Sequence, residues 1–314
     1  MKKPLVIITG PTAVGKTALS IELCKRIGGS VISADSMQVY KGMDIGTAKI
    51  KPEEMDGIPH FLIDEFTPEH EFNVAEFKEK ALEYAGKIYS QGRIPVIVGG
   101  TGFYIQALLY DVDFTEAEED KDYRQQLSDI AENKGNEYLH EMLKEVDPEA
   151  AKAIHSNNVK RVIRALEYNH LTGELISEHN MRERAKESPY NFAYFVLNDD
   201  RKLLYERIDK RIDIMIEQGL VDEVKALKNM GLTRDHVSMK GLGYKEILAY
   251  LDGECSLEEA IYVLKRDTRH FAKRQLTWFK RERDVCWVEK AELDHDEAKI
   301  LEFMLDVLKK KGIG

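Results

Sequence analysis

The chain has 314 residues, and 46 Lys and Arg against 56 Asp and Glu give it a formal net charge of −10 at pH 7. Such a length allows one large domain or two modest ones, and the negative average argues against a protein that coats nucleic acid through charge alone. With 43% hydrophobic and 32% charged residues, the composition is typical of a soluble globular protein and excludes a disordered chain.

The first third of the chain alternates between short apolar runs and helical patterns. Buried β-branched runs of this kind are typical of strands in a parallel sheet that is covered on both faces. The predicted strands are Leu5–Ile8, Val31–Ala34, His60–Ile63, Pro95–Val98 and, later, Ala193–Leu197. The apolar spacing predicts helices over Thr17–Arg26 and Val74–Tyr89. This order predicts an α/β fold with a parallel sheet and flanking helices.

From about Asp111 the pattern changes to helix formers with an acidic bias. Residues 111–150 hold 14 acidic and 4 basic residues, a net charge of −10. We therefore expect an inserted all-helical domain over 113–192, within a core made of 1–112 and 193–314. Beyond it, the predicted helices are Leu203–Gln218, Leu220–Met230, Lys245–Leu251 and Leu257–Arg283.

The cysteines and the apolar runs indicate the cellular compartment of the protein. Cys24, Cys255 and Cys286 are far apart and form no C-x-x-C pair, which argues against a disulfide framework and favours a reducing compartment. The apolar run near the start ends at Thr9, and nowhere do 18 apolar residues follow one another. We therefore expect a cytoplasmic protein without a membrane partner. We also expect a monomer.

A phosphate-binding motif, G-x-x-x-x-G-K-[ST], lies between the first predicted strand and the first helix. Its backbone N–H groups and the helix N-terminus would cradle a diphosphate, with Lys16 as a point charge and the Thr17 hydroxyl on Mg²⁺. The residues expected to bind the diphosphate are Gly10, Pro11, Thr12, Ala13, Val14, Gly15, Lys16 and Thr17. Kinases, NTPases and transferases all use this loop, so the motif leaves the reaction open.

Two more strand ends carry candidate site residues. Asp35 follows the second strand, and because the carboxyl ends of parallel strands meet, it should lie near Lys16 as a general base, a Mg²⁺ ligand or a turn residue. Gly99, Gly100 and Gly102 around Thr101 indicate either close approach of the backbone to a ligand or a plain turn. The strand before them ends without the acidic residue that motor-type NTPases place on Mg²⁺, which weakens the interpretation as such an NTPase. Asp64 could supply this carboxylate instead.

Two helices in the last third carry basic side chains. Arg207 and Arg211 lie four residues apart, a spacing suited to a diphosphate clamp or to a solvated face paired with Asp209 and Asp213. Residues 265–283 hold 8 basic and 2 acidic residues. Helical spacing puts the cations on one face and Phe271 and Trp278 on the other. This pattern favours a surface that binds the nucleic-acid backbone, with the aromatic side chains packed in the protein core.

These segments together resemble the tRNA dimethylallyltransferase (tRNA isopentenyltransferase) family in its bacterial form. The matching segments are GPTAVGKT at 10–17, SADSMQVYKGMDIGTAK at 33–49, VGGTGFY at 98–104, RVIRALE at 161–167, GLGYKE at 241–246 and TRHFAKRQLTWFKRE at 268–282. The first segment is common to P-loop proteins, whereas the second, third and last in fixed order are specific to the family.

The resemblance implies transfer of a dimethylallyl group from dimethylallyl diphosphate to N6 of the adenosine 3′ of the anticodon in tRNA, with Mg²⁺ as cofactor. Asp35 would accept the proton, Thr101 would orient the acceptor and Arg211 would stabilise the leaving diphosphate. It assigns tRNA contacts to Asp35, Ser36, Met37, Gln38, Thr101, Arg124, Lys160, Arg161, Arg164, Lys240, Gly243, Tyr244, Lys245, Lys273, Arg274, Gln275 and Lys280. The alternatives are an ATP-dependent small-molecule or nucleotide kinase and a non-catalytic P-loop RNA-binding module.

Overall fold

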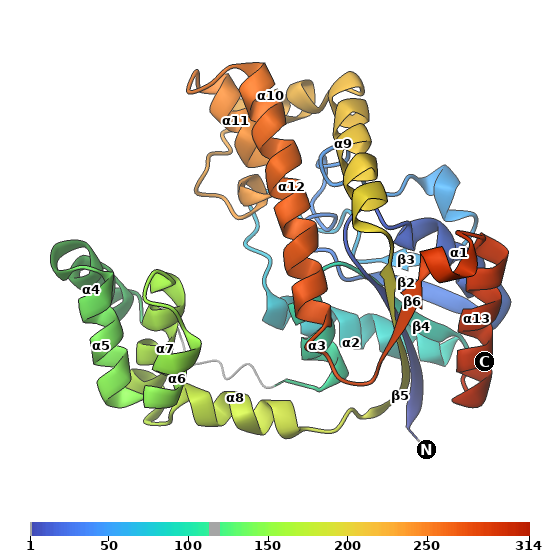
Figure 1. Ribbon diagram of the computed structural model, residues 1–314, viewed down its shortest axis with the longest axis horizontal. Coiled ribbons are helices and arrows are strands. Elements are labelled where there is room, and N and C mark those ends of the chain that lie inside the picture. The colour runs from blue at the N-terminus through green and yellow to red at the C-terminus, as the bar shows by residue number, and fades with distance from the viewer. Residues whose placement is uncertain (1, 113–119) are drawn as a thin grey trace. The chain divides into compact units, whose positions relative to one another are not determined.

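A computed structural model describes residues 2–112 and 120–314 (Figure 1). The chain forms two compact units. The core unit comprises Met1–Leu109 and Pro189–Gly314, and the helical unit comprises Tyr110–Ser188.

The core unit is built on one six-stranded, all-parallel sheet in the order β3-β2-β4-β1-β5-β6. The strands are β1 (Lys3–Thr9), β2 (Gly29–Ser33), β3 (His60–Phe61), β4 (Ile94–Gly99), β5 (Tyr190–Asn198) and β6 (Val285–Glu289). Leu5 to Ile8 in β1 are fully buried, because helices cover the sheet on both sides. The predicted α/β fold with a parallel sheet is confirmed.

Helices flank the sheet and continue beyond it (Figure 1). Helices α1 (Lys16–Ile27) and α13 (Glu297–Lys310) pack together on one face, and α2 (Val74–Ser90) and α3 (Gly102–Leu109) on the other. The helices that follow β5 pack on one another as a group, and α12 also contacts α3. They are α9 (Arg201–Glu217), α10 (Leu220–Asn229), α11 (Tyr244–Leu251) and α12 (Leu257–Phe279).

The described residues of the helical unit contain helices and no strand. These helices are α4 (Lys121–Lys134), α5 (Asn136–Val146), α6 (Pro148–Ala153), α7 (Val159–Thr172) and α8 (Ile176–Ala185). Leu127, Leu139, Leu143, Val162 and Leu166 form the centre of a separate hydrophobic cluster. The unit therefore has its own core, as an independently packed insertion requires. Across the described chain, no helix is long and apolar enough to span a membrane.

Several boundaries differ from the sequence prediction at the sheet edges. Strand β3 has only two residues, because it pairs with β2 alone, and β5 begins at Tyr190, three residues early. Helix α12 ends at Phe279, four residues before the predicted end. The chain then enters β6, which was not predicted because this short edge strand has only one fully buried residue, Val288.

The ends of β2 and β4 approach each other too closely for a side chain. A Cβ atom on Gly99 would lie 2.2 Å from the carbonyl oxygen of Ala34. The backbone N–H of Ala34 in turn donates to the carbonyl of Val98 at 2.8 Å. Glycine at this position is therefore a packing requirement of the sheet.

We expect Gly99→Ala to lower the free energy of unfolding by about 3 kcal/mol, because the added methyl group meets rigid backbone. Gly86→Ala is the matched control: Gly86 lies inside α2 with nothing within 4 Å of its Cβ position. That change should raise stability by about 1 kcal/mol through helix propensity. Urea unfolding followed by circular dichroism measures both, and equal effects would contradict the packing argument.

Candidate active site

The phosphate-binding motif forms the tight loop between β1 and α1. Gly10 and Gly15 have φ angles of 143° and 95°, and a Cβ on Gly10 would lie 2.4 Å from the Leu197 carbonyl oxygen. Lys16 Nζ donates to the carbonyls of Gly10 and Pro11 at 3.0 and 2.9 Å. The loop therefore curls around its own lysine at the N-terminus of α1, a geometry suited to anions.

Lys16 interacts electrostatically with two residues that are distant in the sequence, Arg211 and Asp35. Burial, the largest cause, and the positive charge of Arg211 lower the pKa of Lys16 to about 8, although the carboxylate of Asp35 opposes both effects. Arg211 comes from α9 and Asp35 from the end of β2. The structure thus brings Lys16, Asp35 and Arg211 within electrostatic reach of one another, with two positive charges against one negative charge.

Asp35 acts as a turn residue, one of the three roles that the sequence left open. Its Oδ1 accepts hydrogen bonds from the backbone N–H groups of Met37 at 2.9 Å and Gln38 at 3.3 Å, as a turn aspartate does. Neither of these two hydrogen bonds involves the other carboxylate oxygen of Asp35, Oδ2. Asp35 is half-buried, so this second oxygen can face a substrate group while the first holds the turn.

The glycines around Thr101 crowd against the chain itself. A Cβ on Gly100 would lie 2.1 Å from Gln275 Nε2, and one on Gly102 would lie 2.3 Å from the Trp278 ring. On the Cβ side of both glycines the protein's own α12 fills the space, and the approach of a ligand to this turn stays a prediction. The N–H of Thr101 donates to the Ala34 carbonyl at 3.2 Å, which places Thr101 beside the strand end that carries Asp35.

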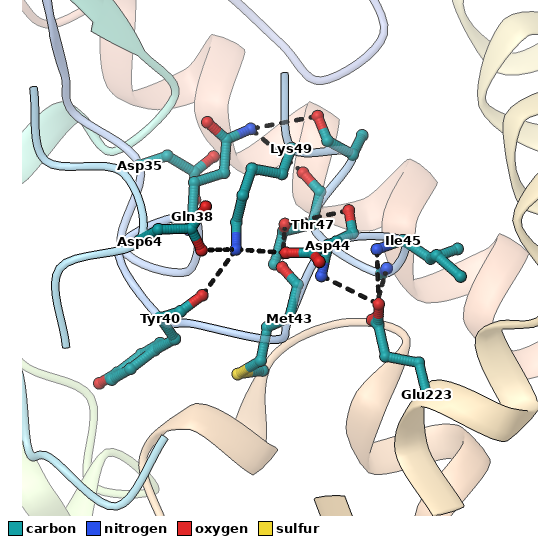
Figure 2. A network of polar contacts seen from close by, with 12 residues as sticks. Asp35, Gln38, Tyr40, Met43, Asp44, Ile45, Thr47, Lys49, Asp64 and Glu223 are labelled. Atoms are coloured by element: carbon teal, nitrogen blue, oxygen red, sulfur yellow. Dashed lines mark hydrogen bonds and ion pairs between the residues drawn. The ribbon is translucent and has the colours of Figure 1, made fainter. Parts of the chain in front are cut away.

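The loop that follows Asp35 is held by one buried lysine, Lys49 (Figure 2). Its Nζ donates to the Tyr40 carbonyl at 2.7 Å, to Asp44 Oδ1 at 2.6 Å and to Asp64 Oδ1 at 2.5 Å. Asp64, the alternative acidic residue for an NTPase, is therefore engaged in an ion pair that shapes this loop. No pattern in the sequence indicated this role for Lys49.

The Gln38 amide is also tied back to this loop. Its Nε2 donates to the carbonyls of Thr47 at 3.2 Å and Ala48 at 3.4 Å (Figure 2). Ser36, Met37 and Gln38 are half-buried in the turn that Asp35 opens. Gln38 therefore already has a structural role in the loop that carries Asp35.

A second anchor, Glu223 of α10, holds the far part of the same loop. Its carboxylate accepts from the N–H groups of Asp44 at 2.9 Å, Ile45 at 2.8 Å and Gly46 at 3.1 Å, as Figure 2 shows for the first two. It also accepts from the Tyr244 hydroxyl at 2.7 Å. Glu223 lies 177 residues from Gly46, so no local pattern could have identified it.

The GLGYKE segment at 241–246 contains both buried and exposed residues. Gly243 and Tyr244 are buried, and the Tyr244 ring lies where a Cβ on Gly46 would come within 2.6 Å. These two residues therefore pack against the loop, and their contact with tRNA stays a prediction. Lys240 and Lys245 are exposed.

Helix α12 presents cations on its outer side. Lys273, Arg274 and Lys280 are exposed, whereas Gln275 is buried, with 5% of its surface accessible. Burial sets Gln275 apart from these exposed cations, and tRNA contact by each of the four residues stays a prediction. A hollow on this helix is lined by His270, Lys273, Arg274, Thr277, Trp278 and Arg281.

In the helical unit, a buried glutamate forms ion pairs with two of the predicted basic residues. Glu167 of α7 accepts from Arg124 Nε at 2.7 Å and from Arg164 Nη1 at 2.9 Å. Burial alone would raise the pKa of Glu167, but these arginines hold it below its usual value. Lys160 and Arg161 are exposed on the same helix. Glu167 was not among the predicted site residues.

Comparison with known proteins identifies the family. The model of the family described as IPP transferase matches residues 38–282. The chain belongs to the IPP transferase family. It is 62% identical over 311 residues to a tRNA dimethylallyltransferase of Lachnoclostridium phytofermentans, with 99% of both chains covered, and 54% identical to one of Acetivibrio thermocellus, with 93% of this chain and 94% of the relative covered.

Solved structures of IPP transferases have the same fold. A full-length tRNA isopentenylpyrophosphate transferase of Bacillus halodurans is 46% identical, with a TM-score of 0.74 over 99% of this chain and 98% of the other. A eukaryotic dimethylallyltransferase acting on tRNA is 31% identical, with a TM-score of 0.79 over 91% of this chain and 74% of the other. The sequence-based recognition of the family is confirmed.

We expect the affinity of this IPP transferase for inorganic diphosphate to fall as the pH rises above about 8, by up to about tenfold per unit. A bound polyanion favours protonated Lys16, and above its pKa of about 8 the lysine must take up a proton on binding. Calorimetry from about pH 7 to about pH 9 measures this. Lys16→Met corrects for titration of the ligand, and parallel pH profiles of the two proteins would contradict the prediction.

Proposed function

We propose that the protein transfers the dimethylallyl group of dimethylallyl diphosphate to N6 of the adenosine 3′ of the anticodon in tRNA and releases diphosphate. The observation that carries this proposal is the grouping of Lys16, Arg211 and Asp35: two cations for a leaving diphosphate beside one carboxylate for a proton. The relatives, which are tRNA dimethylallyltransferases and a tRNA isopentenylpyrophosphate transferase, support the same reaction. They do not favour the kinase alternative.

The donor side of the site supplies positive charge. The bond from the allylic carbon to the diphosphate oxygen breaks, and negative charge grows on that oxygen. The backbone N–H groups of the P-loop, Lys16 and Arg211 lie where they can stabilise this charge, and such preorganised donors commonly dominate catalysis. The lowered pKa of Lys16 supports this assignment, because a desolvated cation whose charge Asp35 offsets only in part gains from an anionic ligand.

The acceptor side of the site supplies a base. The exocyclic amine of adenine is a weak nucleophile, and it loses a proton as its nitrogen forms the bond to carbon. Asp35 is suited to take that proton through Oδ2, while Oδ1 stays bonded to the turn. Thr101, whose N–H is bonded beside Asp35 at the Ala34 carbonyl, is placed to orient the amine.

The residues at the P-loop fit a Mg²⁺ ion bound mainly through the substrate. Thr17 lies exposed in the first turn of α1, and no cluster of three or more His, Cys, Asp or Glu among the described residues could form an all-protein site. Mg²⁺ is commonly held by one or two protein oxygens together with phosphate oxygens and water. Thr17 would hold it here, and the ion would neutralise charge on the leaving diphosphate.

The tRNA partner brings a base that must leave the stack of its loop to reach Asp35. The exposed cations Lys273, Arg274 and Lys280 on α12 are suited to the RNA backbone, and Lys240 and Lys245 add to this charge. The basic residues of the helical unit are suited to the same role. A monomeric, cytoplasmic enzyme remains part of the proposal.

We expect Asp35→Ala to lower kcat for prenyl transfer by about 10²–10⁴-fold while the Kd for tRNA changes little, because a base is needed only in the chemical step. Mass spectrometry of digested tRNA after incubation with dimethylallyl diphosphate and Mg²⁺, without ATP, measures the product. Asp306→Ala, an exposed aspartate on α13, is the control. Near-normal turnover of Asp35→Ala would contradict the role, and ATP consumption without this product would favour a kinase.

We expect Lys273→Glu with Lys280→Glu to weaken tRNA binding and to flatten its salt dependence by about one to two units in the log–log slope, because each phosphate contact contributes about 0.7–0.9. Fluorescence anisotropy over a salt series measures the slope. Lys309→Glu with Lys310→Glu makes the same charge change at the end of α13 and should leave the slope unchanged. Equal slopes in all three proteins would place the RNA elsewhere.

A further inference from the structure

Gln275 of α12 is buried beside two exposed cations. Only 5% of its surface is accessible, whereas Lys273 and Arg274, immediately before it, are exposed. A buried amide needs partners for both its oxygen and its nitrogen, because an unmade hydrogen bond away from water is costly. The partners of Gln275 therefore reveal what its side chain does.

The Gln275 amide bridges two loops of the active site. Its Oε1 accepts from the backbone N–H of Thr12 at 2.9 Å, and its Nε2 donates to the carbonyl of Gly100 at 3.0 Å. The amide has only one possible orientation, since the backbone N–H can only donate and the carbonyl can only accept. The fit is tight, because a Cβ on Gly100 would lie 2.1 Å from Nε2.

These two loops carry the groups assigned to opposite halves of the reaction. They follow the adjacent strands β1 and β4, where Thr9 and Gly99 are paired. The first loop leads to Lys16 at the diphosphate, and the second leads to Thr101 beside the strand end of Asp35. The distance between donor and acceptor therefore depends on how these two loops are spaced.

We propose that Gln275 is a positioning residue that sets the spacing between the P-loop and the Thr101 loop, and that it makes no tRNA contact. This inference rests on the proposed prenyl transfer. Gln275 connects α12 to both loops through one planar group with a donor and an acceptor. Glu, Met and Leu lack one or both of these functions at neutral pH.

Two variants separate positioning from RNA binding. Gln275→Met keeps the length of the side chain but loses both hydrogen bonds, and Gln275→Glu loses the donor to Gly100. We expect each to lower kcat by about tenfold or more and to leave the Kd for tRNA within about twofold. Lys273→Gln, two residues away on the exposed side of α12, should show the contrasting weaker tRNA binding.

The pH dependence of kcat of Gln275→Glu distinguishes loss of positioning from a general structural defect, which would not change with pH in this way. A protonated carboxyl group offers an O–H donor and a carbonyl acceptor in nearly the geometry of the amide. Burial favours this neutral form. The ratio of kcat of Gln275→Glu to kcat of the parent protein should therefore rise as the pH falls from about 8 to about 6, whereas the ratio for Gln275→Met stays flat.

The controls keep the possible outcomes distinct. Gln91→Met and Gln91→Glu make the same changes at the exposed end of α2, and thermal melting verifies folding of each variant. Loss of tRNA affinity with kcat preserved, or a flat ratio for Gln275→Glu, overturns the inference. If Gln275→Glu does not fold, the kcat and Kd of Gln275→Met decide. A parent protein that prenylates no tRNA contradicts the proposed function instead.

Discussion

The close approach of three loops at the carboxyl edge of the sheet is the constraint on which the site depends. Gly10 lies against the Leu197 carbonyl, Gly99 against the Ala34 carbonyl and Gly100 against the Gln275 amide, with no room for a Cβ at any of the three. Because side chains are excluded here, the backbones of neighbouring strands come together just where they turn into loops. Asp35, one residue after Ala34, and Thr101, one residue after Gly100, then lie close together, and the long side chains of Lys16 and Arg211 reach the same place.

Charge in this place is arranged for an anionic ligand. Lys16 is half-buried beside the loop that it follows, and Arg211 adds a second positive charge, which the carboxylate of Asp35 opposes. Burying a cation is unfavourable, and the lowered pKa of Lys16 expresses that strain. A diphosphate relieves it, whereas the carboxylate of Asp35 opposes it only in part. The net charge of −10 of the whole chain hides this local reversal, as it hides the basic outer side of α12.

The sequence was informative where function depends on local pattern and weak where it depends on contacts between distant residues. The P-loop, Asp35 and the parallel sheet follow from motifs and periodicity within about 20 residues. The glycines around Thr101 indicated either the approach of a ligand or a plain turn, and a sequence cannot say that Gln275 and Trp278 of α12 pack against Gly100 and Gly102. Lys49 and Glu223 stayed hidden, because their partners lie in a loop without regular structure. Strand β6 was missed for its weak apolar signal.

The segments that the family resemblance links to tRNA divide into two kinds of residue. Lys240, Lys245, Lys273 and Arg274 are exposed cations, whereas Tyr244 and Gln275, on the same segments, face inward. Tyr244 braces the Asp35 loop through Glu223, and Gln275 joins the P-loop to Gly100. The segments that offer charge to RNA are therefore the ones that hold the catalytic loops, so an RNA bound on the outer side contacts the framework that sets the geometry within.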